Sequence, residues 1–148
     1  RTRVGMIKAY INRKSRILYQ KEELGMSLDK ENQNPAYLCG RLFAVLEKLQ
    51  QDALGNNLNT TIRDSYFASA TSKPAIVFPR LLKLAQSHLK KTSSAIFYQK
   101  LIGEVIDLLR REFPDWRSPS DPGKFIIGYY HQYQSFFVKK DGKKNEEE

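Results

Sequence analysis

Apolar residues recur at helical spacing along most of this chain. The clearest example lies between positions 35 and 54, where the apolar residues three and four positions apart share one face: Leu38, Leu42, Val45, Leu46 and Leu49. Asn34 and Pro35 precede this stripe. Asn caps unpaired helix amides, and proline at the first helical position lacks only an amide that has no partner there. The pattern predicts a helix from Pro35 to about Leu54, ended by Gly55.

Two further amphipathic segments follow. The segment 59–70 predicts a shorter helix, capped by Asn59, whose inward residues are Ile62, Tyr66 and Phe67. Pro79 is expected to end or kink any helix that precedes it. The sequence therefore predicts a turn from Pro74 and then a long helix to Lys91.

Two more helices complete the pattern. Thr92–Ser94 is expected to cap a helix that ends before Pro114, and Gly103 and Gly128 are expected to allow close approach between helices. The apolar residues that these two helices carry are Phe97, Leu101, Ile102, Val105, Ile106, Leu108 and Leu109, then Phe125, Ile126, Tyr129, Tyr130, Tyr133, Phe136 and Phe137. Strand-type alternation is missing from the sequence, so the predicted class is all-α, a compact bundle of five or six helices.

Composition divides the chain into four predicted regions. Residues 1–24 form a basic N-terminal helix without an acid before Glu22, 25–34 a polar linker, 35–138 the helical bundle, and 139–148 a charged, disordered tail. Because the chain begins at Arg1 without a methionine, it is expected to be a fragment of something longer.

Charge narrows the expected partners. The formal net charge is +9, and no Asp or Glu occurs from Ser65 to Gly103 although 28% of residues are charged. Such a field attracts polyanions, either nucleic-acid phosphates or an acidic membrane surface. No run of about 18 apolar residues is present, so no membrane insertion is expected. The single cysteine, Cys39, fits a reducing cytoplasm.

The acid-free segment contains a basic stripe. On a helix, Arg80, Lys83, Ser87, Lys90 and Lys91 fall within an arc of about 100°, opposite Phe78, Leu81, Leu82, Ala85 and Leu89. The basic stripe has two possible interpretations: a solvated face without a ligand, or a face that binds phosphates. The candidate nucleic-acid-binding residues are Arg41, Lys48, Arg63, Lys73, Arg80, Lys83, Lys90 and Lys91, with possible additional contacts from Arg13, Lys14 and Arg16.

Catalytic chemistry is not indicated. His88 and His131 have no Cys, Asp or Glu at metal-ligand spacing, and no pair of carboxylates with a base emerges, so no enzyme, metal, cofactor or small-molecule substrate is expected. The aromatic run between Phe125 and Phe136 offers stacking platforms for bases in one interpretation and core side chains in the other. Helical spacing favours core.

Four segments in order carry a family resemblance: NPAYLCGRLFAVLEKLQ (34–50), TIRDSYFASA (61–70), VFPRLL (77–82) and GYYHQ (128–132). With MIKAYINRK upstream, they resemble the C-terminal region of the large subunit of Cascade, the type I-C CRISPR surveillance complex. The resemblance covers nearly the whole chain. Two positions depart from it: Ser65, where Arg is favoured, and Cys39, where Leu is common.

The resemblance implies a non-catalytic helical bundle in the prokaryotic cytoplasm. In that family the same region is also translated separately as the small subunit, and Met26 stands where such a start is expected, with Met6 as the other candidate. The implied partners are single-stranded non-target DNA, the guide RNA backbone and other Cascade subunits, including copies of the chain itself. Sequence would be recognised by guide pairing rather than by the protein.

Two functions stay open. In the leading one, the chain stabilises the displaced strand of the R-loop through sequence-independent backbone contacts and bridges subunits along the guide RNA. In the alternative, it is a structural spacer that holds the complex together without contacting DNA. An independent helix-turn-helix DNA reader is disfavoured, because no recognition helix with base-reading residues at its start is present.

Overall fold

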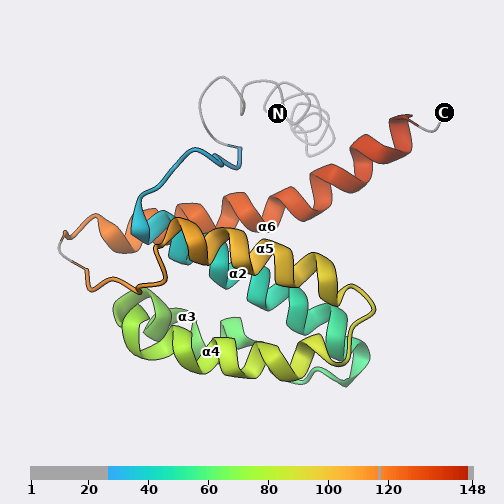
Figure 1. The fold of residues 1–148 in the computed structure, drawn as a ribbon, viewed down its shortest axis with the longest axis horizontal. Helices are drawn as coiled ribbons and strands as arrows, with labels where there is room; N and C mark the ends of the chain where they lie inside the picture. The colour runs from blue at the N-terminus through green and yellow to red at the C-terminus, as the bar shows by residue number, and fades with distance from the viewer. Residues whose placement is uncertain (1–26, 117, 147–148) are drawn as a thin grey trace, which may run out of the picture.

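The computed structural model describes residues 27–116 and 118–146, with side chains described as far as Phe137. These residues form five α-helices and one 3-10 turn, and none of them lies in a strand (Figure 1). The elements are α2 (Pro35–Leu54), η1 (Gly55–Asn57), α3 (Ile62–Ser72), α4 (Pro74–Leu89), α5 (Ala95–Leu108) and α6 (Asp121–Glu146). The all-α prediction is confirmed, while the basic segment 1–24, with Arg13, Lys14 and Arg16, lies outside the described residues.

Helix α2 is the centre of the bundle and contacts each of the other four described helices. In Figure 1, α5 and α6 lie on one side of it, and α3 and α4 lie on the other. Its start is as predicted, because the Asn34 side chain accepts hydrogen bonds from the amides of Ala36, at 3.0 Å, and Tyr37, at 3.3 Å. Almost every residue from Ala36 to Gln50 is buried, including polar ones, so α2 has no solvent face over most of its length.

Helices α2 and α6 touch backbone to backbone. A Cβ atom added to Gly40 would lie 2.7 Å from the Tyr129 amide nitrogen, and one added to Gly128 would lie 2.9 Å from the Tyr37 carbonyl carbon. Any side chain at either position would push the helices apart. The role predicted for Gly128 is confirmed. The role predicted for Gly103 is wrong, since nothing lies within 4 Å of its added Cβ, and Gly40 was not predicted.

The start of α3 differs from its prediction. Thr61, rather than Asn59, is the cap, and it forms a capping box in which Asp64 bonds back to the Thr61 amide. The position of Ile62 explains the shift, because its side chain is buried and its amide donates to Gln50 Oε1 at 2.8 Å. Tyr66 and Phe67 pack against the core as predicted.

Helix α4 begins at Pro74 and runs through Pro79 without a break. The predicted turn between these prolines is therefore wrong. Pro79 removes the hydrogen bond to the Ala75 carbonyl, close to the helix start where few intrahelical bonds precede it. Burial of Phe78 and Leu81 on either side of the proline stabilises the helical course.

The segment after α5 closes the end of the bundle. Arg110 and Arg111 adopt left-handed backbone angles, with φ of 57° and 61°, and reverse the chain. Phe113 then stacks on Phe78 with ring centroids 5.2 Å apart, and the Trp116 indole N–H donates to the Thr71 carbonyl. Two side-chain contacts thus attach this loop to α3 and α4.

Aromatic rings form the middle of the core. Phe43 of α2 makes edge-to-face contacts with Phe67, Phe78, Phe125 and Tyr129. The core interpretation is confirmed for Phe125 and Tyr129, which are buried, whereas Tyr130 and Phe137 of the same helix are 43% and 48% exposed.

Helix α6 continues to Glu146. The predicted boundary at Val138 therefore falls inside a helix rather than at its end. Residues after Val138 are mainly Lys, Glu and Asp, and the long members of this group have good intrinsic helix propensity. Proline is missing there as well, so nothing in the local sequence stops the helix at the predicted point.

Candidate nucleic-acid interface

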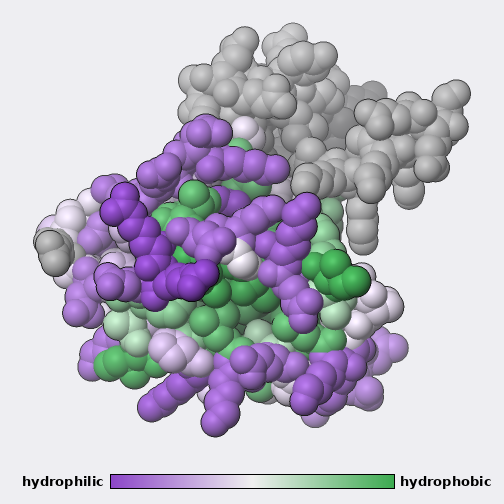
Figure 2. All heavy atoms as spheres, viewed as in Figure 1, coloured by the Kyte–Doolittle hydropathy of each residue, from purple (hydrophilic) through white to green (hydrophobic). Residues whose placement is uncertain are grey.

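Helix α4 presents a stripe of cations to solvent. We define the α4 stripe as Arg80 and Lys83 of α4 together with Lys90 and Lys91, which follow its last residue, Leu89, rather than lying within the helix as predicted; all four are exposed. The opposite face is buried through Phe78, Leu81, Ala85 and His88. Figure 2 shows long hydrophilic side chains along the lower edge of the molecule, where α4 runs in Figure 1. The predicted amphipathic division of this helix is confirmed.

The α4 stripe has no acidic partner within the part of the chain that the structure describes. The ion pairs found there are Lys48–Asp52, at 3.2 Å, and Arg111–Asp107, at 3.7 Å. Lys73, at the junction of α3 and α4, is also exposed. Four cations on one face repel one another, so an anion that binds there relieves repulsion as well as gaining attraction.

Lys48 does not belong to this surface. It lies on α2, pairs with Asp52 one turn later, and stands 5.9 Å from the centre of the Phe137 ring. An intrahelical ion pair and an aromatic contact already satisfy its charge.

Arg63 is held within a cluster of aromatic rings. Its guanidinium donates to the hydroxyls of Tyr129 and Tyr130, at 3.0 Å each, and lies 5.1 Å from the centre of the Phe67 ring. The hydrogen bond to Tyr130 is the main cause that raises the pKa of Arg63. This guanidinium stabilises the contact between α3 and α6.

A buried carboxylate supports the same cluster. Glu47 of α2 is 4% exposed and accepts a hydrogen bond from the Tyr129 hydroxyl. Burial raises the pKa of Glu47, while the Tyr129 bond and the positive charge of Arg63 act in the opposite direction. A polar chain from Glu47 through Tyr129 to Arg63 thus links α2, α6 and α3.

Arg41 is buried rather than exposed, with 2% of its surface accessible. Its Nε donates to Gln132 Oε1 of α6 at 3.0 Å, and its Nη1 is a buried donor without a hydrogen-bond partner. Burial lowers the pKa of Arg41, although nearby Tyr37, Glu104 and Asp29 partly offset this effect. The sequence placed Arg41 among surface cations, and no local signal distinguishes it, because α2 is buried on all sides.

A cavity of about 280 Å³ adjoins Arg41. We define the Arg41 pocket by the side chains that determine its chemistry: Lys30, Arg41, Phe97, Lys100, Glu104 and Gln132. It lies between the segment before α2 and helices α2, α5 and α6, and α4 contributes no lining residue. The sequence pattern does not predict this pocket, because its walls come from four separate segments.

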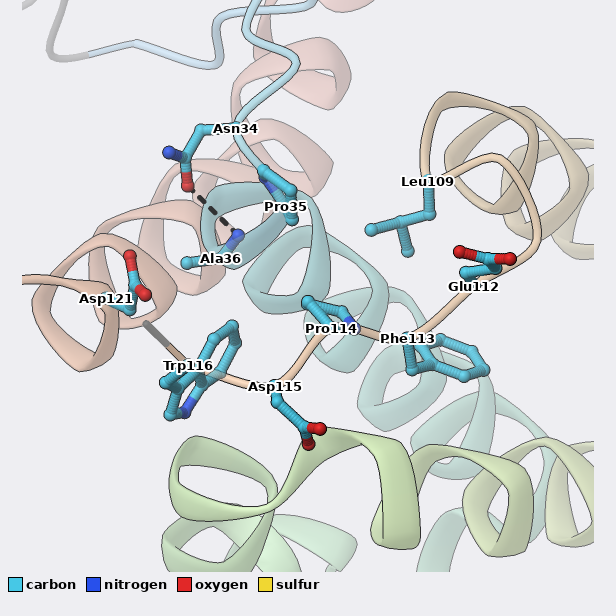
Figure 3. Close-up of a pocket in the computed structure, with 10 residues that line it drawn as sticks. All are labelled: Asn34, Pro35, Ala36, Leu109, Glu112, Phe113, Pro114, Asp115, Trp116 and Asp121. Carbon is cyan, nitrogen blue, oxygen red and sulfur yellow. Dashed lines mark hydrogen bonds between the residues drawn. The ribbon is translucent and has the colours of Figure 1, made fainter. Parts of the chain in front are cut away.

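A larger cavity of about 490 Å³ has the opposite charge. Among the described residues, its lining includes Glu112, Asp115 and Asp121 and no Lys or Arg (Figure 3). Figure 3 shows the Asn34 side chain bonded to the Ala36 amide on one side of this cavity and the Trp116 ring on another. The carboxylates disfavour a phosphate ligand here, so this cavity does not extend the cationic surface.

The histidines have structural surroundings. His88 is buried on α4, and burial, followed by the charge of Lys91, lowers its pKa. His131 Nδ1 lies 2.9 Å from the Tyr37 hydroxyl, which also accepts the Asp29 amide. Over the described residues, no three His, Cys, Asp or Glu side chains cluster so as to hold a metal ion. Nor is any described helix long and apolar enough to cross a membrane.

Comparison with known families decides the assignment. The family model described as CRISPR-associated protein (Cas_Csd1) matches residues 1–137. The chain belongs to the Cas_Csd1 family. A search of curated proteins finds no match. Membership of Cas_Csd1 confirms the CRISPR association expected from the four sequence segments. Assignment to type I-C and equivalence to a small subunit stay predictions.

Proposed function

We propose that this Cas_Csd1 chain is a non-catalytic subunit of a type I-C CRISPR interference complex that holds single-stranded DNA through backbone contacts. The observation that carries the proposal is the α4 stripe, which is exposed, basic and without an acidic partner among the described residues. Family membership supports a role in CRISPR defence, and the charge pattern supports a phosphate ligand.

The stripe suits phosphates rather than bases. Residues three and four apart on a helix lie about 5–6 Å from each other, a separation comparable with that of successive phosphates in an extended strand. The lysine ammonium group is a point charge, and its contacts with phosphates carry no information about the base sequence. Binding by this face is therefore independent of sequence, which suits a complex whose specificity comes from guide pairing.

The implied ligands are the displaced non-target strand of the R-loop and the guide RNA backbone. A subunit that holds the displaced strand disfavours re-annealing and lengthens the life of the R-loop. Other subunits, including further copies of this chain, would extend the contact along the strand, so that weak single contacts act together. The prokaryotic cytoplasm is the predicted location.

A structural spacer is the second candidate. The observation that favours it is a set of exposed apolar side chains, notably Ile96 at 82% and Phe97 at 49% exposure in the first turn of α5. Figure 2 also shows hydrophobic surface across the middle of this face. Such surface commonly marks a protein contact. Under this function, changes on α5 dissociate the complex and changes on α4 do not affect it.

The test compares two triple variants in the assembled complex. The stripe variant combines Arg80→Ala, Lys83→Ala and Lys90→Ala. The control combines Arg110→Ala, Arg111→Ala and Lys124→Ala, which remove the same charge from exposed positions outside α4. We expect the stripe variant to assemble normally and to shorten R-loop lifetime, while the control retains the unmodified lifetime. Equal lifetimes for both variants would contradict strand holding by α4.

A further inference from the structure

The Arg41 pocket combines features that the fold itself does not use. A buried arginine usually has a carboxylate partner, because an unpaired buried charge is costly. Here the neutral Gln132 side chain takes Nε, and the buried Nη1 has no hydrogen-bond partner. Arg41 thus lines the cavity without an ion-pair partner among the described residues, and its Nη1, which has less than 1 Å² of accessible surface, meets an anion only when the side chain shifts toward the cavity.

The other charges around the pocket reinforce this preference. Lys30 and Lys100 are exposed at its edge, and Glu104 is the acidic residue that lines it. Together with Arg41, the described lining residues carry a net charge of two positive units, which matches a phosphate better than a neutral ligand. A phosphate in the cavity would offset the desolvation of the Arg41 guanidinium, and a shift of that side chain toward it would give Nη1 its missing hydrogen bond.

The apolar part of the lining suits a base. Phe97 of α5 is 49% exposed, and Phe136 of α6 also lines the cavity. An aromatic ring beside cations is the arrangement that single-stranded nucleic-acid sites use, with phosphate on the charge and base on the ring. The volume of about 280 Å³ is close to the lower end of ligand pockets, about 300 Å³, and fits one nucleotide unit.

We propose that the Arg41 pocket binds one nucleotide of a single strand, with its phosphate against Arg41, Lys30 and Lys100 and its base against Phe97. This inference rests on the proposed function, since it assigns the bound strand a second contact. It differs from the α4 stripe in its helices and in its chemistry. The stripe attracts phosphates only, whereas the pocket also contacts a base.

The first test uses a ten-residue oligothymidylate that carries one 5-iodouracil, photocrosslinked to the full chain. The variant Phe97→Ala is compared with Ile96→Ala, a more exposed neighbour that does not line the pocket. We expect the crosslink in the unmodified chain to map to the peptide containing Phe97. Phe97→Ala should remove that crosslink and weaken affinity about tenfold, with an unchanged salt slope, because stacking involves no counterion release. Ile96→Ala should match the unmodified chain.

The second test removes charge from the pocket edge. Lys30→Ala with Lys100→Ala changes two exposed residues and leaves the core intact. The slope of log affinity against log salt is negative. We expect its magnitude to decrease by about 1.4, because two phosphate contacts of about 0.7 each are lost. An unchanged slope, together with equal affinities for Phe97→Ala and Ile96→Ala, would overturn the inference.

A third arm separates this inference from the proposed function. The stripe variant of α4 is measured in the same assay. If only the stripe variant loses binding, the α4 function stands and the pocket inference is overturned. If only the pocket variants lose binding, the pocket inference stands and the α4 function fails. Competition by a glutamate-rich peptide, with no crosslink at Phe97, would assign the pocket to a protein ligand and overturn the inference.

Discussion

The two sides of α2 are built differently. Toward α4, the central helix packs through apolar and aromatic side chains such as Phe43 against Phe78. Toward α6, it packs backbone against backbone at Gly40 and Gly128, and the same interface buries Arg41 and Glu47 with partners on α6. Apolar packing toward α2 leaves the outer face of α4 exposed to solvent, whereas on the α6 side Glu47 and the Nε atom of Arg41 are bonded within the fold.

This difference separates two kinds of cation. Arg63 and Lys48 have intramolecular partners, so their charges stabilise the fold, whereas buried Arg41 donates to the neutral Gln132 side chain. The α4 stripe has no such partner among the described residues. A basic residue whose charge is already paired within the fold is therefore weak support for a ligand site, and an exposed stripe without acids is stronger support.

The largest expected effect is at the glycine contact. Gly40→Ala and Gly128→Ala should each lower the free energy of unfolding by about 3 kcal/mol, because the new methyl group meets backbone that cannot move aside without separating the helices. Urea denaturation measures this change. Gly103→Ala is the control and should stabilise the chain by about 0.5–1 kcal/mol, since its Cβ meets open space within a helix. Full stability in Gly40→Ala would show that the helices are not in backbone contact.

A smaller loss in the free energy of unfolding is expected when the hydrogen-bond chain from Glu47 through Tyr129 to Arg63 is broken. Tyr129→Phe removes the hydroxyl that joins Glu47 to Arg63, so the buried carboxylate loses a donor. We expect a loss of about 1–2 kcal/mol in unfolding free energy. Tyr130→Phe, which removes an exposed hydroxyl bonded to the same guanidinium, should cost less than about 0.5 kcal/mol. Equal losses in the two variants would contradict a buried network.

The pH dependence of stability tests whether His88 is buried on the apolar side of α4. Burial lowers its pKa in the folded chain below its unfolded value, about 6.5. The unfolded chain therefore binds more protons below that pH, and stability falls as pH decreases through this range. His88→Gln should reduce the loss of melting temperature between pH 7 and pH 5. An identical pH dependence in the variant would show that His88 is not kept neutral by burial.

The smallest stability effect is expected on the α4 stripe itself. Arg80→Ala, Lys83→Ala and Lys90→Ala together should change the free energy of unfolding by less than about 1 kcal/mol, because exposed helix positions accept alanine readily. Removal of like charges offsets the lost side-chain contacts. Circular dichroism should show full helicity. A stripe variant that unfolds would place these side chains within the fold and end the contrast with α6.

Local signals in the sequence predicted the elements that depend on local physics. Asn34 and Pro35 determine the start of α2, and the apolar period of α4 determines which cations are exposed. The prediction of a turn before Pro79 was wrong because tertiary packing keeps α4 helical through this proline. Arg41 was predicted to be exposed because the sequence alone does not distinguish a charged residue on a fully buried helix from one on the surface. Gly40 did carry a signal, since glycine inside a helix is costly without a packing reason.

The most direct test of the central claim is fluorescence anisotropy of a labelled random single strand with the unmodified chain, across a salt series. A duplex of the same sequence, the stripe variant and the Arg110, Arg111 and Lys124 control are measured beside it. If α4 holds the strand, binding is salt-sensitive and prefers the single strand. The magnitude of the slope of log affinity against log salt should then be smaller by about 2.1 in the stripe variant, because three contacts of about 0.7 each are lost. A stripe variant that binds the strand with the affinity and slope of the control would contradict the account.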